Sequence, residues 1–206
     1  MSTLSEKALT ADPAPLGLSA FAITTFLLSF ANLGLIPAAS AVVVMPLALF
    51  YGGSAQLIAG CFEMRKGNTF GFTALSSYGA FWLFYAGLVL LGSMGIINPP
   101  PIALGVALVL WGIFTFYMWI PSMFINLSLA LTFSFLWPAF LALGIGAGMN
   151  WQIATQVGGA LGLGAAFFAG YTGFAVTTNS IVGPGTIPLG RGLKKKTPPP
   201  AATEFP

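Results

Sequence analysis

Residues 12–18 read Asp-Pro-Ala-Pro-Leu-Gly-Leu and lead directly into an apolar stretch long enough to cross a lipid bilayer. Pro15 suits the first turn of a helix, where its missing N–H costs no hydrogen bond. Asp12 places an oxygen acceptor just ahead of that turn, and Gly17 lets another group approach the backbone closely. The segment predicts the start of a first membrane helix, whose free N–H groups and positive dipole end suit a small anion. The alternative is a capped membrane helix with no ligand.

The composition of the whole chain is that of a membrane protein. Of its 206 residues, 57% are hydrophobic and only 5% are charged, whereas soluble domains carry about 25% charged residues. A helix needs about 20 apolar residues to cross a bilayer, and six spans meet that length: 16–36, 42–62, 70–97, 102–120, 124–148 and 151–176. The sequence therefore predicts an all-α membrane protein with six transmembrane helices per protomer.

The positive charges predict an orientation in the membrane. All seven Lys and Arg residues fall in three segments that six helices place on one side: Lys7, then Arg65 and Lys66, then Arg191, Lys194, Lys195 and Lys196. Because Lys and Arg favour the cytoplasmic side, both termini are expected there, with the protein in the plasma (inner) membrane. The predicted organisation is a cytoplasmic tail over 1–12, a six-helix domain over 13–178, and a flexible, basic and proline-rich cytoplasmic tail over 179–206.

The residues that the chain lacks exclude several classes of function. It has no histidine, which argues against haem ligation, His-based metal sites and His-lined ammonium pores. No acid or base lies deep in a predicted span, and no nucleophile–base–acid set can be assembled. We therefore expect neither an enzyme nor a cofactor, a metal or a nucleic-acid partner. A passive or weakly coupled pathway for a small solute remains, beside a purely structural membrane protein.

Uncharged polar groups and small residues recur at helical spacing. Thr25, Ser29 and Asn32 share one face of the first span, which predicts either a polar stripe along a pathway or hydrogen bonds between helices. A second stripe, of Gly158, Gly162, Ala166 and Gly170, predicts close helix contact, either inside the bundle or between protomers.

Three further motifs follow the opening one along the chain. Residues 51–57 read Tyr-Gly-Gly-Ser-Ala-Gln-Leu, residues 67–71 Gly-Asn-Thr-Phe-Gly, and residues 77–82 Ser-Tyr-Gly-Ala-Phe-Trp. In this order and spacing they closely resemble the acetate uptake transporter family, whose signature is N-P-A-P-L-G-L, F-Y-G-G-x-A-Q, G-N-T-F-G and S-Y-G-x-F-W. The resemblance is specific over about the first half of the chain. It implies a six-helix protomer assembled as a hexamer, each protomer with its own monocarboxylate pathway.

The resemblance also implies a constriction formed by a Phe, a Tyr and a Leu from the first, third and fifth helices. The matching positions are Phe21, Tyr78 and Leu131. Counted from the predicted helix starts at a rise of 1.5 Å per residue, they lie roughly 9–12 Å deep, at one level. The hydroxyl of Tyr78 is expected to offer a hydrogen bond to the solute. The other residues expected along the pathway are Pro15, Leu16, Gly17, Thr25, Asn32, Gln56, Glu63, Asn68, Thr69 and Ser77.

Asp12 departs from the family pattern, and Glu63 has an alternative interpretation. Asp12 stands where the signature has Asn, and an ionised aspartate repels a carboxylate unless it caps its own helix. For Glu63 the alternative is a surface ion pair with Arg65 or Lys66.

The leading prediction for function is a channel or weakly coupled transporter for acetate and other short carboxylates such as succinate. The alternatives are a channel for a small neutral solute, such as urea or another amide, and a scaffold or sensor that transports nothing.

Overall fold

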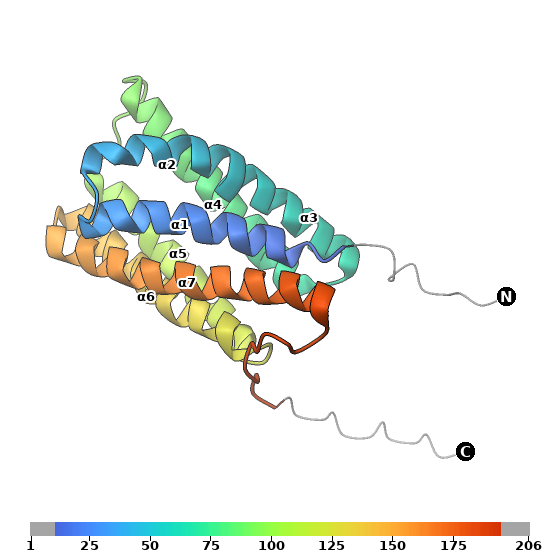
Figure 1. The fold of residues 1–206 in the computed structure, drawn as a ribbon. Coiled ribbons are helices and arrows are strands. Elements are labelled where there is room, and N and C mark those ends of the chain that lie inside the picture. Colours follow the sequence, from blue (N-terminus) through green and yellow to red (C-terminus); the bar gives the residue numbers. More distant parts are fainter. Residues whose placement is uncertain (1–10, 195–206) are drawn as a thin grey trace, which may run out of the picture.

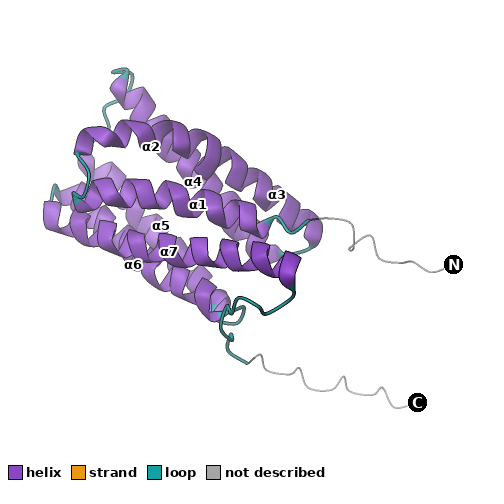
Figure 2. Ribbon diagram, in the orientation of Figure 1, coloured by secondary structure: helices purple, strands orange, loops and turns teal. Residues whose placement is uncertain are grey.

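Helices make up all the regular structure in residues 11–194, the part of the chain that this computed structural model describes (Figure 2). Six helical spans are long and apolar enough to cross a membrane, as predicted. They are α1 (Ala14–Leu33), the composite span Val42–Lys66, α4 (Thr69–Ser93), α5 (Pro101–Ser122), α6 (Leu127–Met149) and α7 (Gln152–Val182).

The second span is not a uniform α-helix. A 3₁₀ turn (Ala38–Ser40) leads into α2 (Ala41–Leu47), a π-helical stretch (Ala48–Ala55) and α3 (Gln56–Lys66). Pro46 lies inside α2 and lacks an N–H, and the wider turns follow directly after it. The Tyr-Gly-Gly-Ser motif lies in these π-helical turns, which are frequent at functional sites.

Each helix packs along its neighbours in one bundle (Figure 1). α1 lies against α7, α6 lies between α5 and α7, and α3 lies against α4 and α1. The start of α1 and the end of α7 lie at the same end of the bundle, at the right of Figure 1. The chain turns at this end between α3 and α4 and between α5 and α6.

Small residues allow the helices to come this close. A Cβ added to Gly105 of α5 would lie 2.7 Å from the carbonyl oxygen of Gly144 on α6, so the two backbones are in direct contact. In the predicted stripe on α7, Gly158 packs against Leu143 and Gly162 against Ser29. This stripe therefore contacts α6 and α1 within one chain.

The end of the chain differs from the tail expected over 179–206. The predicted boundary at 178 falls inside α7, and residues 183–193 then turn back along α6 and α7. Asn179 accepts from the N–H of Ile187 at 2.7 Å and donates to its carbonyl oxygen at 2.9 Å. The carbonyl of Leu189 accepts from the N–H of Ser128 at 3.0 Å, which satisfies one free donor in the first turn of α6. Residues 195–206 lie outside the described part of the chain.

Candidate functional site

A cavity of about 200 Å³ opens at the end of the bundle where α1, α4 and α6 begin. The residues that line it lie on one face of each helix. On α6, for example, Leu129, Thr132, Phe133 and Leu136 recur at helical spacing. We call Asp12, Lys66, Asn68 and Asn126 the rim of this cavity, and Phe21, Tyr78 and Leu136 its inner end.

Two asparagines of the rim begin the helices that surround it. Asn68 Oδ1 accepts from the N–H of Gly71 at 3.1 Å, and Asn126 Oδ1 accepts from the N–H of Leu129 at 2.8 Å. Each side chain caps the first turn of its helix, α4 or α6. Because α1 starts here as well, three helix N-termini and their positive dipole ends surround the rim.

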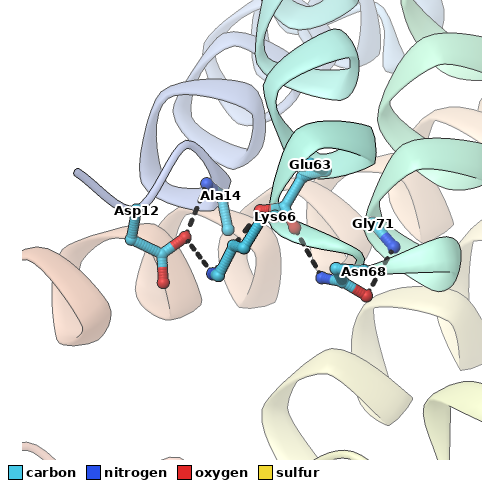
Figure 3. Close-up of polar contacts among 6 residues, drawn as sticks. All are labelled: Asp12, Ala14, Glu63, Lys66, Asn68 and Gly71. Atoms are coloured by element: carbon cyan, nitrogen blue, oxygen red, sulfur yellow. Dashed lines mark hydrogen bonds and ion pairs between the residues drawn. The ribbon is translucent and has the colours of Figure 1, made fainter. Parts of the chain in front are cut away.

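Asp12 and Lys66 form an ion pair at the rim (Figure 3). Lys66 Nζ lies 2.9 Å from Asp12 Oδ1, and the same oxygen accepts from the N–H of Ala14 at 3.0 Å. Asp12 thus accepts from the N–H of Ala14, the first residue of its own helix. The ammonium of Lys66 compensates that charge directly.

Glu63 is fully buried behind the rim, with 0% of its surface exposed, so the alternative of an ion pair with Lys66 is present at 3.9 Å but does not lie on the surface. Its Oε2 accepts from Asn68 Nδ2 at 2.6 Å, while Oε1 lies 3.9 Å from Lys66 Nζ and accepts no hydrogen bond within residues 11–194 (Figure 3). Gly71 makes room for this carboxylate, because a Cβ there would lie 2.8 Å from Oε2. Glu63 does not line the cavity itself. No group of three side chains able to hold a metal ion forms in the same described part.

The inner end of the cavity is aromatic. The ring centroids of Phe21 and Tyr78 lie 5.9 Å apart, and those of Tyr78 and Phe133 6.1 Å apart. Both Phe21 and Tyr78 are buried in the hydrophobic core that α1, α4, α5 and α6 share. The structure therefore brings together two of the three residues expected at a constriction.

Leu131, the third, does not line the cavity; Leu136 does. The depth estimate for Leu131 assumed a helix from residue 124, but α6 begins at Leu127 after the Asn126 cap. At 1.5 Å per residue, Leu131 is only about 6 Å into its helix, whereas Leu136 and Tyr78 are each about 13 Å into theirs. Leu136 is thus the leucine at the level of Tyr78.

The hydroxyl of Tyr78 is not offered to the cavity as expected. It donates to Oγ1 of Thr115 on α5 at 3.0 Å, and Thr115 in turn donates to the carbonyl oxygen of Trp111 at 2.7 Å. Because a tyrosine hydroxyl carries a single proton, its donor is used inside the protein. Tyr78 presents its ring to the cavity.

Gln56 brings an amide into this aromatic surrounding. It is the first residue of α3 after the π-helical turns, is 1% exposed, and lines the cavity. Its Oε1 has no hydrogen-bond partner in the described residues. The hydroxyls of Thr132 and Thr172, by contrast, donate to carbonyls of their own helices.

Of the ten residues expected along the pathway, only Gln56 and Asn68 line the cavity. Leu16, at 43% exposure, and Thr69 lie on the outside of the bundle, and Gly17 packs against Leu75. Thr25 is buried, and its hydroxyl accepts or donates no hydrogen bond within 11–194. Besides Glu63, the other three that do not line the cavity are Pro15, Asn32 and Ser77.

Sequence reasoning missed Lys66, Leu129, Phe133 and Leu136 as lining residues. The three on α6 follow from the Asn126 cap, since counting on from it in steps of three and four residues reaches each of them. For Lys66 the sequence indicates a topological charge and a candidate partner of Glu63, but not a position in the cavity lining.

Comparison with known proteins gives consistent matches. Residues 2–190 match the model of the GPR1/FUN34/yaaH family. Acetate permease A of Emericella nidulans is 40% identical over 211 residues, an alignment that covers 91% of this chain and 71% of the permease. The succinate-acetate/proton symporter SatP of Escherichia coli is 37% identical over 181 residues, covering 87% and 95%. The solved structure of the bacterial acetate channel SatP matches with a TM-score of 0.84 at 36% identity, covering 88% of this chain and 99% of that one.

Proposed function

Because the chain belongs to the GPR1/FUN34/yaaH family, we propose that it is a membrane channel or transporter for acetate and other short carboxylates such as succinate. The observation that carries the proposal is the cavity with its aromatic inner end, on a fold that matches a solved acetate channel with a TM-score of 0.84. The acetate permease and the succinate-acetate/proton symporter among the relatives are named for transport, which agrees with the prediction that this chain is not an enzyme.

The solute enters at the rim and passes the inner end. Three helix N-termini and the ammonium of Lys66 attract a carboxylate to the rim. Phe21, Tyr78 and Leu136 then form an apolar constriction, which penalises a hydrated ion and passes a small, partly dehydrated solute. The amide of Gln56 supplies a polar contact beside this constriction without a charge.

The proposal includes an orientation and an assembly. Arg65 and Lys66 lie in the last turn of α3, and Arg191 and Lys194 lie in the segment that follows α7, at the end of the bundle where α1 begins. This distribution supports cytoplasmic termini in the plasma membrane. Each protomer holds its own cavity within one chain, so a homo-oligomer, a hexamer by the family resemblance, gives parallel pathways.

The experiment is solute uptake by the purified protein in liposomes. We expect labelled acetate to enter faster than into empty liposomes, succinate to compete, and urea to stay excluded. Entry of urea or acetamide in place of acetate would favour a channel for neutral solutes. If neither solute entered, the protein would be a scaffold or sensor, and the proposal would fail.

A further inference from the structure

Resting on the proposed function, we infer that Lys66 is the carboxylate-binding group at the rim, and that Asp12 is a built-in competitor which the solute's carboxylate displaces. The inference concerns which residue admits the substrate, and it is carried by the geometry of three charged side chains, Asp12, Glu63 and Lys66 (Figure 3).

Lys66 has hydrogen-bonding capacity left over. Its ammonium carries three donors, and the two carboxylates use little of that capacity. Asp12 lies at 2.9 Å, within hydrogen-bond distance, whereas Glu63 at 3.9 Å is too far for a hydrogen bond. The side chain is 40% exposed and lines the cavity, so an incoming carboxylate reaches it from the solvent side.

Only one of the two resident carboxylates is free to leave. Glu63 is fully buried, and Asn68 holds it at 2.6 Å. Asp12 is 39% exposed and precedes the first turn of α1, so a rotation of its side chain moves it into water. When Asp12 leaves, the buried charge of Glu63, whose Oε1 has no hydrogen bond in the described residues, still holds the ammonium in place.

Asp12 also sets the charge that an approaching anion meets. The carboxylate of Asp12 adds one negative charge on the exposed side of this cluster. Asp12→Asn removes that charge, and its amide oxygen can still accept from the N–H of Ala14. The substitution therefore removes the charge of residue 12 and keeps its hydrogen bond to the start of α1.

The test compares initial rates of acetate uptake into liposomes for wild type and Asp12→Asn. We expect the acetate concentration at half-maximal flux to fall roughly fivefold at low salt, the effect of one unit charge about 4 Å away in water. The difference shrinks as ionic strength rises. The rate of acetamide entry, a control with the shape of acetate and no charge, is expected to be the same low value in both proteins.

Matched variants sharpen the result. Lys66→Gln is expected to raise the half-maximal acetate concentration. Arg65→Gln removes the neighbouring exposed cation, which does not line the cavity, and is expected to change nothing. An unchanged or raised half-maximal acetate concentration in Asp12→Asn would overturn the inference. An equal increase in acetamide uptake would overturn it as well, because the substitution would then have widened the rim and not removed a competing charge. Asp12→Ser, which also caps a helix, replaces Asp12→Asn if that protein does not fold.

A second measurement separates this inference from the proposed function. Modification of Lys66 by an amine-reactive reagent, followed by mass spectrometry of the protein in detergent, requires no transport. We expect acetate to slow the modification, and to do so at lower concentration in Asp12→Asn. Absence of acetate flux together with such protection would refute the transport function and leave the binding site standing; no protection would refute the site.

Discussion

The hydroxyl of Tyr78 on α4 and Oγ1 of Thr115 on α5 are joined by a hydrogen bond of 3.0 Å, between residues 37 positions apart. This bond holds the tyrosine hydroxyl toward α5, so that its ring, and not its polar end, lines the cavity beside Phe21. The polarity of the inner end therefore depends on a partner outside the cavity lining.

Tyr78→Phe tests this relationship. The ring and its contacts remain, so we expect acetate flux close to that of the wild type. We expect a loss of stability of about 1 kcal/mol for the missing hydrogen bond. Uptake assays and thermal unfolding in detergent measure the two effects. A large loss of acetate flux in Tyr78→Phe would show that the hydroxyl serves the solute after all.

Phe21→Ala and Tyr78→Ala remove side chains from the proposed constriction. We expect the flux of a bulkier carboxylate, such as butyrate, to rise relative to that of acetate, because the apolar opening widens. Each truncation also costs about 3–5 kcal/mol of stability, since both residues are buried in the core. The ratio of the two fluxes corrects for the amount of folded protein, and an unchanged ratio in both variants would contradict the constriction.

Leu136→Ala and Leu131→Ala form a matched pair on α6. Leu136 lines the cavity and Leu131 does not. We expect only Leu136→Ala to change the ratio of butyrate to acetate flux. The reverse result would restore the assignment that the resemblance alone favoured.

Gly105→Ala and Gly87→Ala test the close contact of α5 and α6. A Cβ on Gly105 meets the backbone of Gly144 at 2.7 Å, whereas a Cβ on Gly87 has nothing within 4 Å. We expect Gly105→Ala to destabilise the protein by about 1–3 kcal/mol. Gly87→Ala is expected to be neutral or slightly stabilising, because alanine favours a helix. Thermal unfolding of the two variants side by side measures this difference in stability.

Asn68→Ala and Asn126→Ala both remove a helix cap, worth about 1 kcal/mol. Only Asn68 also donates to the buried Glu63. We therefore expect Asn68→Ala to be the more destabilising, since it leaves a buried carboxylate without its side-chain hydrogen bond. Adding Glu63→Gln to Asn68→Ala removes that charge and is expected to recover part of the loss, and equal melting temperatures for the two single variants would refute the argument.

The sequence predicted the helices well because long apolar spans and the placement of charge decide them. The family resemblance pointed to Phe21 and Tyr78, and their depths could be estimated because Pro15 and Asn68 mark the starts of their helices. It misplaced the start of α6, because residues 123–125 are as apolar as the helix although Phe124 belongs to a turn, with its N–H bonded to the carbonyl of Pro121.

Other features depend on contacts that no local pattern reveals. The burial of Glu63 requires the space left by Gly71 and the amide of Asn68, which only the turn between α3 and α4 brings together. The orientation of the Tyr78 hydroxyl requires Thr115, on a different helix. Residues 183–193 are held along α6 by backbone hydrogen bonds, such as that from the N–H of Ser128. Because every residue type carries the same backbone carbonyl, the sequence does not indicate these bonds.

The aromatic inner end has a consequence for how this protein can diversify. Tyr78 packs on Phe21, Phe133 and Phe140 from two other helices, so the rings that line the cavity also hold the bundle together. A substitution that enlarges the opening necessarily removes packing from the core. Variants selected to accept a larger substrate are therefore expected to need a compensating stabilising mutation elsewhere, a trade-off between tolerance for new solutes and thermal robustness.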